Sequence, residues 1–416
     1  MRVVLLDSGY EYFDPLSLTR PTFEMSMGLG SLREEILKLV DPSDVILVTR
    51  PHLIEYLKDR SNLKVFPSLG EVLDEGPVLL LDGRGRGVKK VLEIADNWDR
   101  DILIVDSKGR PLGIYLARGL RDVDVPDLSS ILPALRERGR EVKREPCEGA
   151  ELIVSPWDLL PRLDEVMNHV HQPPLMSDVE GDVETGAVIL GERILIEKGA
   201  YVEAGARLDA RSGWILIEKG AYVEAGARLD GPVHVGEGSV IYSCSRVSSS
   251  YIGPVCRVGG EVEGTVIEGY TNKHHHGFIG HSYLGEWVNL GAGTTNSDLK
   301  NTYGTVRVWL GGRRVDTGRM KYGVLIGDMV KTAIGTMIYA GRKIGVSSHV
   351  YGTVRRDVPS FTIWREGGTN EELSLEKALE IQERMMKRRG MELSRSLRSL
   401  IERVFHLTKG ERESLG

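Results

Sequence analysis

Two identical sixteen-residue segments constrain the fold of this chain more than any other feature. The sequence ILIEKGAYVEAGARLD stands at residues 194–209 and again at 215–230, an offset of 21 residues. Aliphatic residues also fall at every sixth position within and after the second copy, and again nearer the C-terminal end: Ile217, Val223, Leu229, Val235, Ile241, Val247, Ile338, Ile344 and Val350. A period of six fits neither one face of a helix nor an alternating strand.

The six-residue period is typical of a β-helix built from hexapeptide repeats. Each coil of such a prism has about 18 residues and three flat sides, with aliphatic side chains inside and glycine or small residues at the corners. We therefore predict a left-handed parallel β-helix over residues 177–365. The offset of 21 then represents one coil with a few residues bulged outward, and the two copies represent a duplicated coil that lengthens the prism.

The part of the chain before residue 170 has a different pattern. Amphipathic segments such as 31–40 alternate with short apolar runs of strand length, which lie at 3–6, 45–48, 78–81 and 102–105. This alternation predicts an α/β, Rossmann-like domain with a parallel sheet over residues 1–170. The prolines near residues 171–174 indicate a linker. A renewed helical pattern predicts a C-terminal helical tail over 366–416.

Composition argues against several kinds of partner. The formal net charge of −6 argues against nucleic acid. No apolar run approaches the roughly 18 residues of a membrane span, and the N-terminus lacks the features of a signal peptide. The three cysteines, Cys147, Cys244 and Cys256, fit neither a zinc site nor a disulfide framework. We interpret them as reduced and buried, in a cytoplasmic protein.

The segment 269–296 interrupts the six-residue period and is rich in histidine. It contains His274, His275, His276 and, a little further on, His281. Imidazole titrates near neutral pH, so a positioned ring can remove a proton from an attacking amine. The alternative interpretation is a solvated polar loop, or histidines that cap a coil.

At these residues the sequence resembles a known family. The C-terminal half is similar to the acetyltransferase domain of the bifunctional GlmU family, and the whole chain resembles shorter, divergent GlmU-like proteins with a Thr-Arg-Pro signature, here Thr19-Arg20-Pro21. The resemblance is carried mainly by residues 252–254, 256–261, 272–273, 277–281, 285–287 and 289–292.

This resemblance implies a nucleotidyltransferase-like N-terminal domain and two reactions. The first joins a nucleoside triphosphate to a sugar-1-phosphate, with Mg²⁺, and releases pyrophosphate. The second transfers the acetyl group of acetyl-CoA to a hexosamine-1-phosphate, on the route to UDP-N-acetylglucosamine. A homotrimer is expected, because prisms packed side by side form clefts between subunits.

The resemblance also assigns residues of the acyltransferase site. Aligning residues 289–293 without gaps places His275 on the catalytic histidine, the general base for amine attack on the thioester. Asn289 falls on a residue of the sugar-phosphate pocket, and Ala292 on one near the acetyl-CoA thioester. Lys273 is a further candidate for substrate binding.

Three positions of this site depart from the family or carry over less closely. Arg257 lies one position away from the phosphate-binding arginine, where its guanidinium fork would suit a sugar phosphate. Glu263 and Phe278 stand where the family has a lysine and a tyrosine. Arg257 could equally be a surface charge, and Asn289 and Ala292 could be corner residues of a coil.

The N-terminal site has fewer recognisable parts. The usual Gly-rich phosphate loop is missing, and residues 5–9 supply only Gly9. The resemblance places Arg20 on a phosphate-contacting basic residue, although an arginine there can also be structural. Asp82, after a buried strand, and Asp158 are candidate Mg²⁺ ligands, although an aspartate before glycine is commonly a turn residue.

Two alternative functions remain open from the sequence. The missing loop favours an acyltransferase with a degenerate nucleotide-binding domain, or a protein that only binds a sugar nucleotide. Some hexapeptide prisms instead bind zinc through three histidines across a trimer interface and hydrate CO₂. His276, His281 and His234 would be the ligands in that case.

Overall fold

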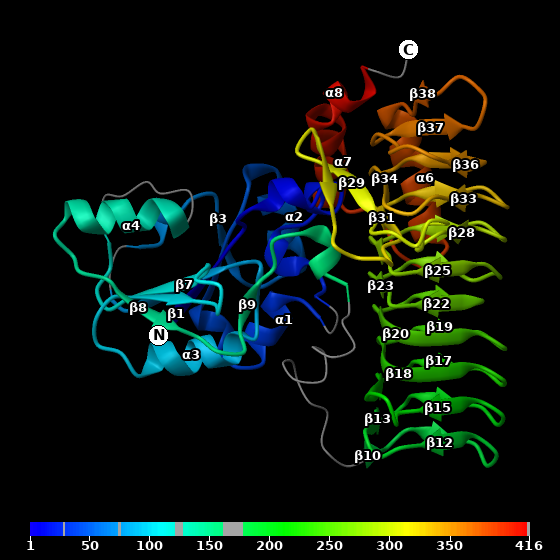
Figure 1. Cartoon of the computed structure of the whole chain (residues 1–416), viewed down its shortest axis with the longest axis horizontal. Coiled ribbons are helices and arrows are strands. Elements are labelled where there is room, and N and C mark those ends of the chain that lie inside the picture. The colour runs from blue at the N-terminus through cyan, green and yellow to red at the C-terminus, as the bar shows by residue number, and fades with distance from the viewer. Residues whose placement is uncertain (28–29, 74–75, 121–127, 161–177, 414–416) are drawn as a thin grey trace. The chain divides into compact units, whose positions relative to one another are not determined.

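The computed structural model describes the chain outside residues 28–29, 74–75, 121–127, 161–177 and 414–416 (Figure 1). The chain forms two compact units. The first comprises residues 1–13, 19–156 and 395–400, and the second comprises 14–18, 157–394 and 401–416. The expected linker at 171–174 lies outside the described residues, and the domain boundaries stay predictions.

The first unit contains a seven-stranded sheet in the order β3-β2-β1-β4-β7-β6-β8. The strands are β1 (Arg2–Leu6), β2 (Val45–Val48), β3 (Lys64–Phe66), β4 (Val78–Asp82), β6 (Ile102–Val105), β7 (Pro111–Leu116) and β8 (Lys143–Pro146). A small second sheet pairs β5 (Gly85–Arg86) with β9 (Glu151–Leu152).

The sheet is mixed, so the expectation of a parallel sheet holds for part of it: β3, β2, β1 and β4 are parallel neighbours, and so are β6 and β8. Strand β7 runs antiparallel to both β4 and β6. The reason is the short turn after β6, where the Asp106 carboxylate accepts hydrogen bonds from the backbone N–H groups of Lys108 and Arg110. A tight turn joins consecutive strands as an antiparallel hairpin, whereas a parallel pair needs a long crossover.

Helices and an apolar core complete the first unit. Ser31 caps α1 reciprocally with Glu34, as a capping box. The core joins alternate residues of the central strands, such as Val4 and Leu80, with Ile131 and Leu135. The helices are α1 (Leu32–Leu37), α2 (Ile54–Arg60), α3 (Val88–Asp96) and α4 (Leu128–Glu137), joined by short 3-10 helices.

The second unit is a parallel β-helix, as predicted. Its first face stacks β10 (Asp178–Val179), β13 (Ile194–Ile196), β16 (Ile215–Ile217), β18 (Arg228–Val235), β20 (Arg246–Ile252), β23 (Val266–Ile267), β26 (Tyr283–Leu284), β31 (Val324–Ile326) and β34 (Arg342–Ile344). The inward side chains of all coils form one continuous aliphatic column.

The second face stacks a parallel ladder that ends in an antiparallel strand: β11 (Asp182–Val183), β14 (Tyr201–Val202), β17 (Tyr222–Val223), β19 (Val240–Ile241), β21 (Arg257–Val258), β24 (Asn272–Lys273), β27 (Asn289–Leu290), β32 (Lys331–Thr332), β35 (His349–Tyr351), β37 (Thr362–Arg365) and β38 (Glu371–Glu372). The third face contains β12 (Val188–Leu190), β15 (Arg207–Asp209), the first halves of β18 and β20, β22 (Glu261–Glu263), β25 (Phe278–Gly280), β28 (Thr295–Asn296), β33 (Met337–Ile338) and β36 (Thr353–Val354).

The two identical segments lie directly above one another. Ile194 pairs with Ile215 and Tyr201 with Tyr222, so each residue of the first copy meets its counterpart in the second. The two tyrosine rings stack with centroids 5.2 Å apart. The interpretation of the repeat as one duplicated coil is therefore confirmed, with residues 210–214 making the extra length between strands.

A hairpin interrupts the coils between β28 and β31. Strands β29 (Arg307–Leu310) and β30 (Arg313–Asp316) pair in antiparallel register around Gly311 and Gly312. Both glycines have positive φ, +57° and +73°, which the two-residue turn of a tight hairpin requires. No periodic pattern in the sequence predicts this hairpin.

The C-terminal tail is helical, as expected. It contains α6 (Leu375–Lys387), α7 (Arg395–Leu407) and α8 (Lys409–Arg412). Helix α6 lies beside the coils in Figure 1, and its Gln382 side chain accepts a hydrogen bond from Lys331 of the second face at 3.4 Å. Among the helices that the structure describes, none has the length and apolar character needed to span a bilayer.

The three cysteines are free thiols, but only two of them are buried. Cys147 and Cys256 lie in the interior as expected, and burial raises the pKa of Cys256 to about 12. Cys244 is exposed, which corrects the expectation. It occupies a coil corner with a φ of +58° and not one of the inward positions.

Candidate functional site

One outward position of the second face gathers polar residues from coils that are far apart in sequence. In consecutive coils this position holds Arg257, Asn272, Asn289, Lys331 and His349, which are paired in register. Parallel pairing brings residues at the same position of successive coils within about 5 Å of one another along the stack. The five side chains therefore form one polar ladder.

A groove of about 440 Å³ runs along this ladder, and we call it the α6 groove. The end of α6 and the residues that follow it supply part of the lining, and the coil corner that carries the histidines supplies another part. The lining residues are Tyr242, Arg257, Asn272, His274, Asn289, Lys331, Arg384, Met385, Arg388 and Arg389. Five of them are cationic and none is acidic.

The arginines of the α6 groove have different partners: Arg384 pairs with Glu380, which lies outside the lining, whereas Arg257 is held by neutral groups. Nη1 of Arg257 donates to the carbonyl oxygens of Gly238 and Cys256, at 3.0 and 2.9 Å. Burial lowers the pKa of Arg389, and the nearby positive charge of Arg257 lowers it further. An anion in the groove would relieve this repulsion and bind through charge-assisted hydrogen bonds.

Lys331 is the most strongly perturbed cation of the groove. Its amino group donates to the carbonyl oxygen of Met329 at 2.7 Å and to Gln382 at 3.4 Å. Loss of hydration lowers the pKa of Lys331 to about 7. A bound phosphate would favour the charged form, so this lysine can exchange a proton when an anion binds.

Three rings stack at the corner of the groove. The rings of Tyr242 and His274 are parallel with centroids 3.8 Å apart, and the rings of His274 and His275 follow at 4.7 Å. Partial burial lowers the pKa of His274, and the neighbouring His275 lowers it further. The His274 imidazole is therefore mainly neutral at pH 7 and can accept a proton. His274 lines the groove, and His275 stacks against it.

Lys273 lies inside the coil and not in the groove. Its side chain is only 2 % exposed, and Nζ donates to the carbonyl oxygens of Gly259 and His275 at 2.7 and 2.6 Å. Burial lowers the pKa of Lys273 to about 8. Lys273 was expected to bind substrate, but its amino group instead holds the backbone of the histidine segment from inside the coil.

Asn289, assigned to the sugar-phosphate pocket, and Ala292, assigned near the thioester, lie in different positions. Asn289 lines the α6 groove, and its Oδ1 accepts a hydrogen bond from Asn272 at 2.9 Å. Ala292 lies at the following corner, half-buried, where its carbonyl oxygen accepts a hydrogen bond from Gly335 N. The lining of the groove does not include Ala292.

The two departures from the family lie on the third face. Glu263 forms an ion pair with Lys321 at 2.9 Å, and Phe278 packs beside Gly280. Nearby, Nδ1 of His281 lies 2.7 Å from Oδ2 of Asp298.

The three histidines of the zinc alternative have separate surroundings within this chain. His281 contacts Asp298, as above, and Nε2 of His234 lies 3.1 Å from Glu218. His276 is exposed at the coil corner. Over the described part of the chain, no three histidine, cysteine or acidic side chains gather as metal ligands.

The two aspartates expected to bind Mg²⁺ form ion pairs with arginines. Both oxygens of Asp82 accept hydrogen bonds from Arg84, at 2.9 and 2.8 Å, and the carboxylate is nearly inaccessible. Asp158 pairs with Arg319 at 3.1 Å. A magnesium ion needs free carboxylate oxygens. In this arrangement the two aspartates do not fit it.

The rest of the N-terminal site is similarly closed. Arg84 lies against Gly9, where a β-carbon would stand 2.2 Å from Nη1 of the arginine. Arg20 is buried, and its carbonyl oxygen accepts a hydrogen bond from Arg50 at 3.1 Å. Asp7, which the sequence analysis overlooked, accepts hydrogen bonds from Thr49 and Arg50. Asp7 follows β1 and Asp82 ends the neighbouring strand β4, so adjacent pairing of these two strands would have placed the two carboxylates close together.

Comparison with known proteins agrees with this architecture. Residues 3–169 match a family model described as sugar nucleotidyl transferase. A "Bifunctional sugar-1-phosphate nucleotidylyltransferase/acetyltransferase" of Sulfurisphaera tokodaii is 38% identical over 100 residues, which is 24% of this chain and 25% of the relative. A "Bifunctional protein GlmU" of Methanocaldococcus jannaschii is 29% identical over 230 residues, 53% of this chain and 50% of the relative. Over these regions the chain is similar to GlmU-like proteins. It spans a quarter to a half of the length of these relatives.

Solved structures also resemble part of this chain. A UDP-N-acetylglucosamine acyltransferase of Francisella novicida is 15% identical, with a TM-score of 0.29, and covers 57% of this chain and 79% of its own. A hexapeptide transferase family protein of Anaplasma phagocytophilum is also 15% identical, with a TM-score of 0.23, and covers 55% of this chain and 91% of its own. The β-helix itself is established by the strand pairing of the chain.

Proposed function

We propose that this protein is a bifunctional transferase of sugar-nucleotide synthesis. The β-helix would transfer the acetyl group of acetyl-CoA to the amine of a hexosamine-1-phosphate, and the N-terminal domain would join a sugar-1-phosphate to a nucleoside triphosphate. The observation that carries the acyl-transfer proposal is the α6 groove, where a neutral imidazole, two asparagine amides and five cations face one cavity.

The groove contains the groups that amine acetylation needs. Arg257 and Lys331 would hold the sugar phosphate, and the amide of Asn289 would orient the sugar. The amine attacks the thioester carbon, so that a C–N bond forms, the C–S bond breaks and CoA leaves as a thiolate. We assign His275 as the base that takes the amine proton, with His274 stacked on it as the ring nearest the cavity. The proton can then pass to the departing thiolate.

Release of CoA from acetyl-CoA in the presence of glucosamine-1-phosphate tests this assignment. We expect His275→Ala to lower kcat by about 10²- to 10⁴-fold, the usual contribution of a general base. His274→Ala tests the neighbouring ring in the same assay, and His406→Ala, an exposed histidine of α7, is the matched control. Full activity of both His275→Ala and His274→Ala would exclude imidazole base catalysis in this groove.

Nucleotidyl transfer is supported by the family match of residues 3–169 and by the Thr19-Arg20-Pro21 signature. A specific observation favours a second candidate for this domain. Asp82 is held by Arg84 and Arg84 lies on Gly9, which suits a domain that binds a nucleotide without turnover. Pyrophosphate release from UTP or dTTP with a hexose-1-phosphate separates the two: turnover supports the bifunctional enzyme, and binding without turnover supports the single-activity acyltransferase.

We further propose that the protein acts as a cytoplasmic homotrimer. The exposed side chains of Ile334 and Tyr351, 79 % and 47 % accessible, would contact neighbouring prisms, and the free thiols suit a reducing compartment. Light scattering on the purified protein tests the assembly, since a monomer or dimer at micromolar concentration would contradict it. Ile334→Asp should shift the mass toward the monomer.

A further inference from the structure

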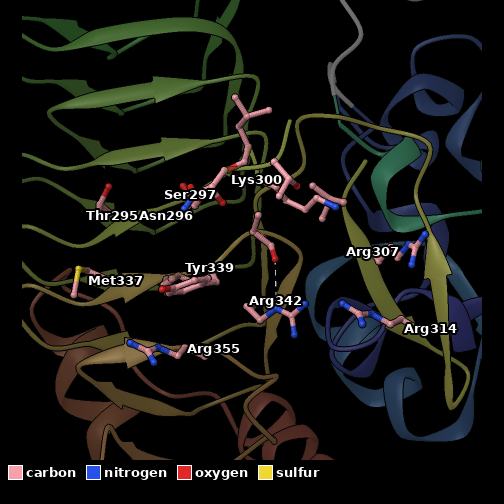
Figure 2. A pocket seen from close by; sticks show the side chains of 16 residues that line it. Thr295, Asn296, Ser297, Lys300, Arg307, Arg314, Met337, Tyr339, Arg342 and Arg355 are labelled. Atoms are coloured by element: carbon pink, nitrogen blue, oxygen red, sulfur yellow. Dashed lines mark hydrogen bonds between the residues drawn. The ribbon is translucent and has the colours of Figure 1, made fainter. Parts of the chain in front are cut away.

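A second cavity, of about 740 Å³, lies on the third face of the β-helix, and we call it the hairpin cavity. Figure 2 shows Arg307 and Arg314 on the β29–β30 hairpin, Met337, Tyr339 and Arg355 on the coils, and Arg342 between the two groups. Lys300, at the start of the inserted segment, completes the cationic lining. The hairpin cavity shares no lining residue with the α6 groove.

The lining of the hairpin cavity has five cationic side chains and no acidic one. Three of the cations have a carboxylate nearby: Asp316 lies 3.4 Å from Arg307, Asp357 lies 3.7 Å from Arg342, and Arg355 is close enough to Glu366 to help lower the pKa of that carboxyl. Within the described ranges, Lys300 and Arg314 form no ion pair with any acidic side chain. Like charges brought together in this way repel one another, so the cavity favours an anionic ligand.

The cations stand on two opposite walls. Arg307 and Arg314 come from the hairpin, whereas Arg342 and Arg355 come from the coils, as Figure 2 shows. A single small anion held on one wall would not contact the cations of the other wall. A ligand with at least two phosphate groups can contact both walls, and arginine binds phosphate oxygens through paired N–H donors.

The floor of the cavity also offers a flat ring. The Tyr339 side chain is 51 % exposed, and the guanidinium of Arg355 lies 5.7 Å from the centre of its ring. Met337 lies beside it in the lining and is equally exposed. An exposed aromatic ring next to arginines suits a nucleobase, which stacks on the ring while its phosphates pair with the cations.

We infer that the hairpin cavity is a binding site for a nucleotide with two or more phosphate groups, separate from the α6 groove. The β29–β30 hairpin supplies one wall of this site, which gives the insertion between two coils a function. A nucleoside diphosphate sugar and the 3′-phosphorylated ADP part of CoA share this chemistry. The inference does not depend on the acyl-transfer proposal, because the two cavities have no residue in common.

Calorimetric titration of the full-length protein tests the site with four probes: ADP, UDP-N-acetylglucosamine, CoA and neutral uridine. We expect at least one of the three phosphorylated probes to bind, with an affinity that falls as salt is raised, and uridine not to bind. Preference for CoA or for UDP-N-acetylglucosamine identifies the source of the nucleotide. Absence of binding by all three phosphorylated probes would overturn the inference.

Variants of the hairpin locate the binding. Arg314→Ala should weaken the affinity of the phosphorylated probe about ten-fold or more, the usual loss for a charged hydrogen bond. Arg313→Ala is the matched control, because neighbouring strand residues point to opposite sides and Arg313 is absent from the lining. Both positions are exposed, so circular dichroism should show unchanged folding. An equal loss in both variants, or a loss only in Arg257→Ala of the α6 groove, would refute this location.

Discussion

Buried charges are paired within the first unit, whereas the α6 groove has an excess of positive charge. In the first unit two buried carboxylates are each paired with an arginine: Asp82 with Arg84 and Asp7 with Arg50. In the α6 groove, cations such as Arg257 and Lys331 donate hydrogen bonds to backbone carbonyls, and the lining contains no acidic side chain. A charge that is neutralised within the protein serves the fold, whereas an excess of one sign around a cavity indicates a ligand of the other sign. The α6 groove is therefore suited to bind an anionic ligand, whereas the carboxylates of the first unit are already paired.

The largest effect should follow from breaking the matched pair of the first unit. Asp82→Ala leaves the guanidinium of Arg84 largely buried without its partner, and we expect a loss of about 3 kcal/mol in the free energy of unfolding. Urea denaturation measures it. The control is Asp99→Ala, whose exposed pair with Arg100 should contribute less than about 0.5 kcal/mol. Unchanged stability, with pyrophosphate release abolished, would instead make Asp82 a catalytic residue.

Removing a cation from the groove should impair binding more than stability. Arg257→Ala should raise the KM for hexosamine-1-phosphate about 10- to 100-fold, because a charged hydrogen bond to phosphate contributes about 1.5–3 kcal/mol. Its kcat should change little. Steady-state kinetics measure both constants, with Arg403→Ala on α7 as the control. A fall in kcat alone would place Arg257 at the reacting atoms and not at the phosphate.

The unmatched lysine should make stability depend on pH. The pKa of Lys331 is near 7 in the folded protein and near 10.5 when unfolded, so between these values the unfolded chain binds the extra proton. The free energy of unfolding therefore rises with pH over this window. Lys331→Met should flatten the rise by about 1 kcal/mol, a modest value because the side chain keeps some contact with solvent. Equal slopes of unfolding free energy against pH in both proteins would contradict the perturbed pKa.

The smallest effect should come from shortening the prism away from the groove. Deleting residues 194–214 removes one of the two identical coils and joins Arg193 to Ile215, which occupies the place of Ile194 in the same register. Since each coil contacts only its neighbours, the groove should keep its geometry. Acetyl transfer should stay within about two-fold of the wild type. A large loss of activity would show that the duplicated coil contributes to catalysis.

The sequence predicted the β-helix well because its signal is periodic. Inward aliphatic residues at every sixth position determine both the coil and its register. The two identical segments indicate the same coil twice, in the same register. The mixed sheet of the first unit was missed at β7, because the Asp106 turn that reverses the chain is a local feature without periodicity. The β29–β30 hairpin was missed for the same reason.

The candidate site was only partly predictable. Arg257 and Asn289 were proposed from the resemblance, and the structure brings both to the groove. Lys331 and the arginines after residue 383 were missed, because the lysine comes from a coil beyond the hairpin insertion and the arginines come from α6 and the residues that follow it. Lys273 was expected at the substrate, but strand alternation turns its side chain inward. Side-chain direction depends on the register of each coil, which a resemblance between sequences does not give.

The side chains of the polar ladder on the second face are regularly spaced along the groove. Successive rungs are about 4.8 Å apart, so the four steps from Arg257 to His349 span about 19 Å. A ligand lying along the stack would meet each kind of side chain at a fixed height. Substituting one residue of the polar ladder would alter only the contact made at its position along the stack. Ligand specificity along this face can therefore change one residue at a time.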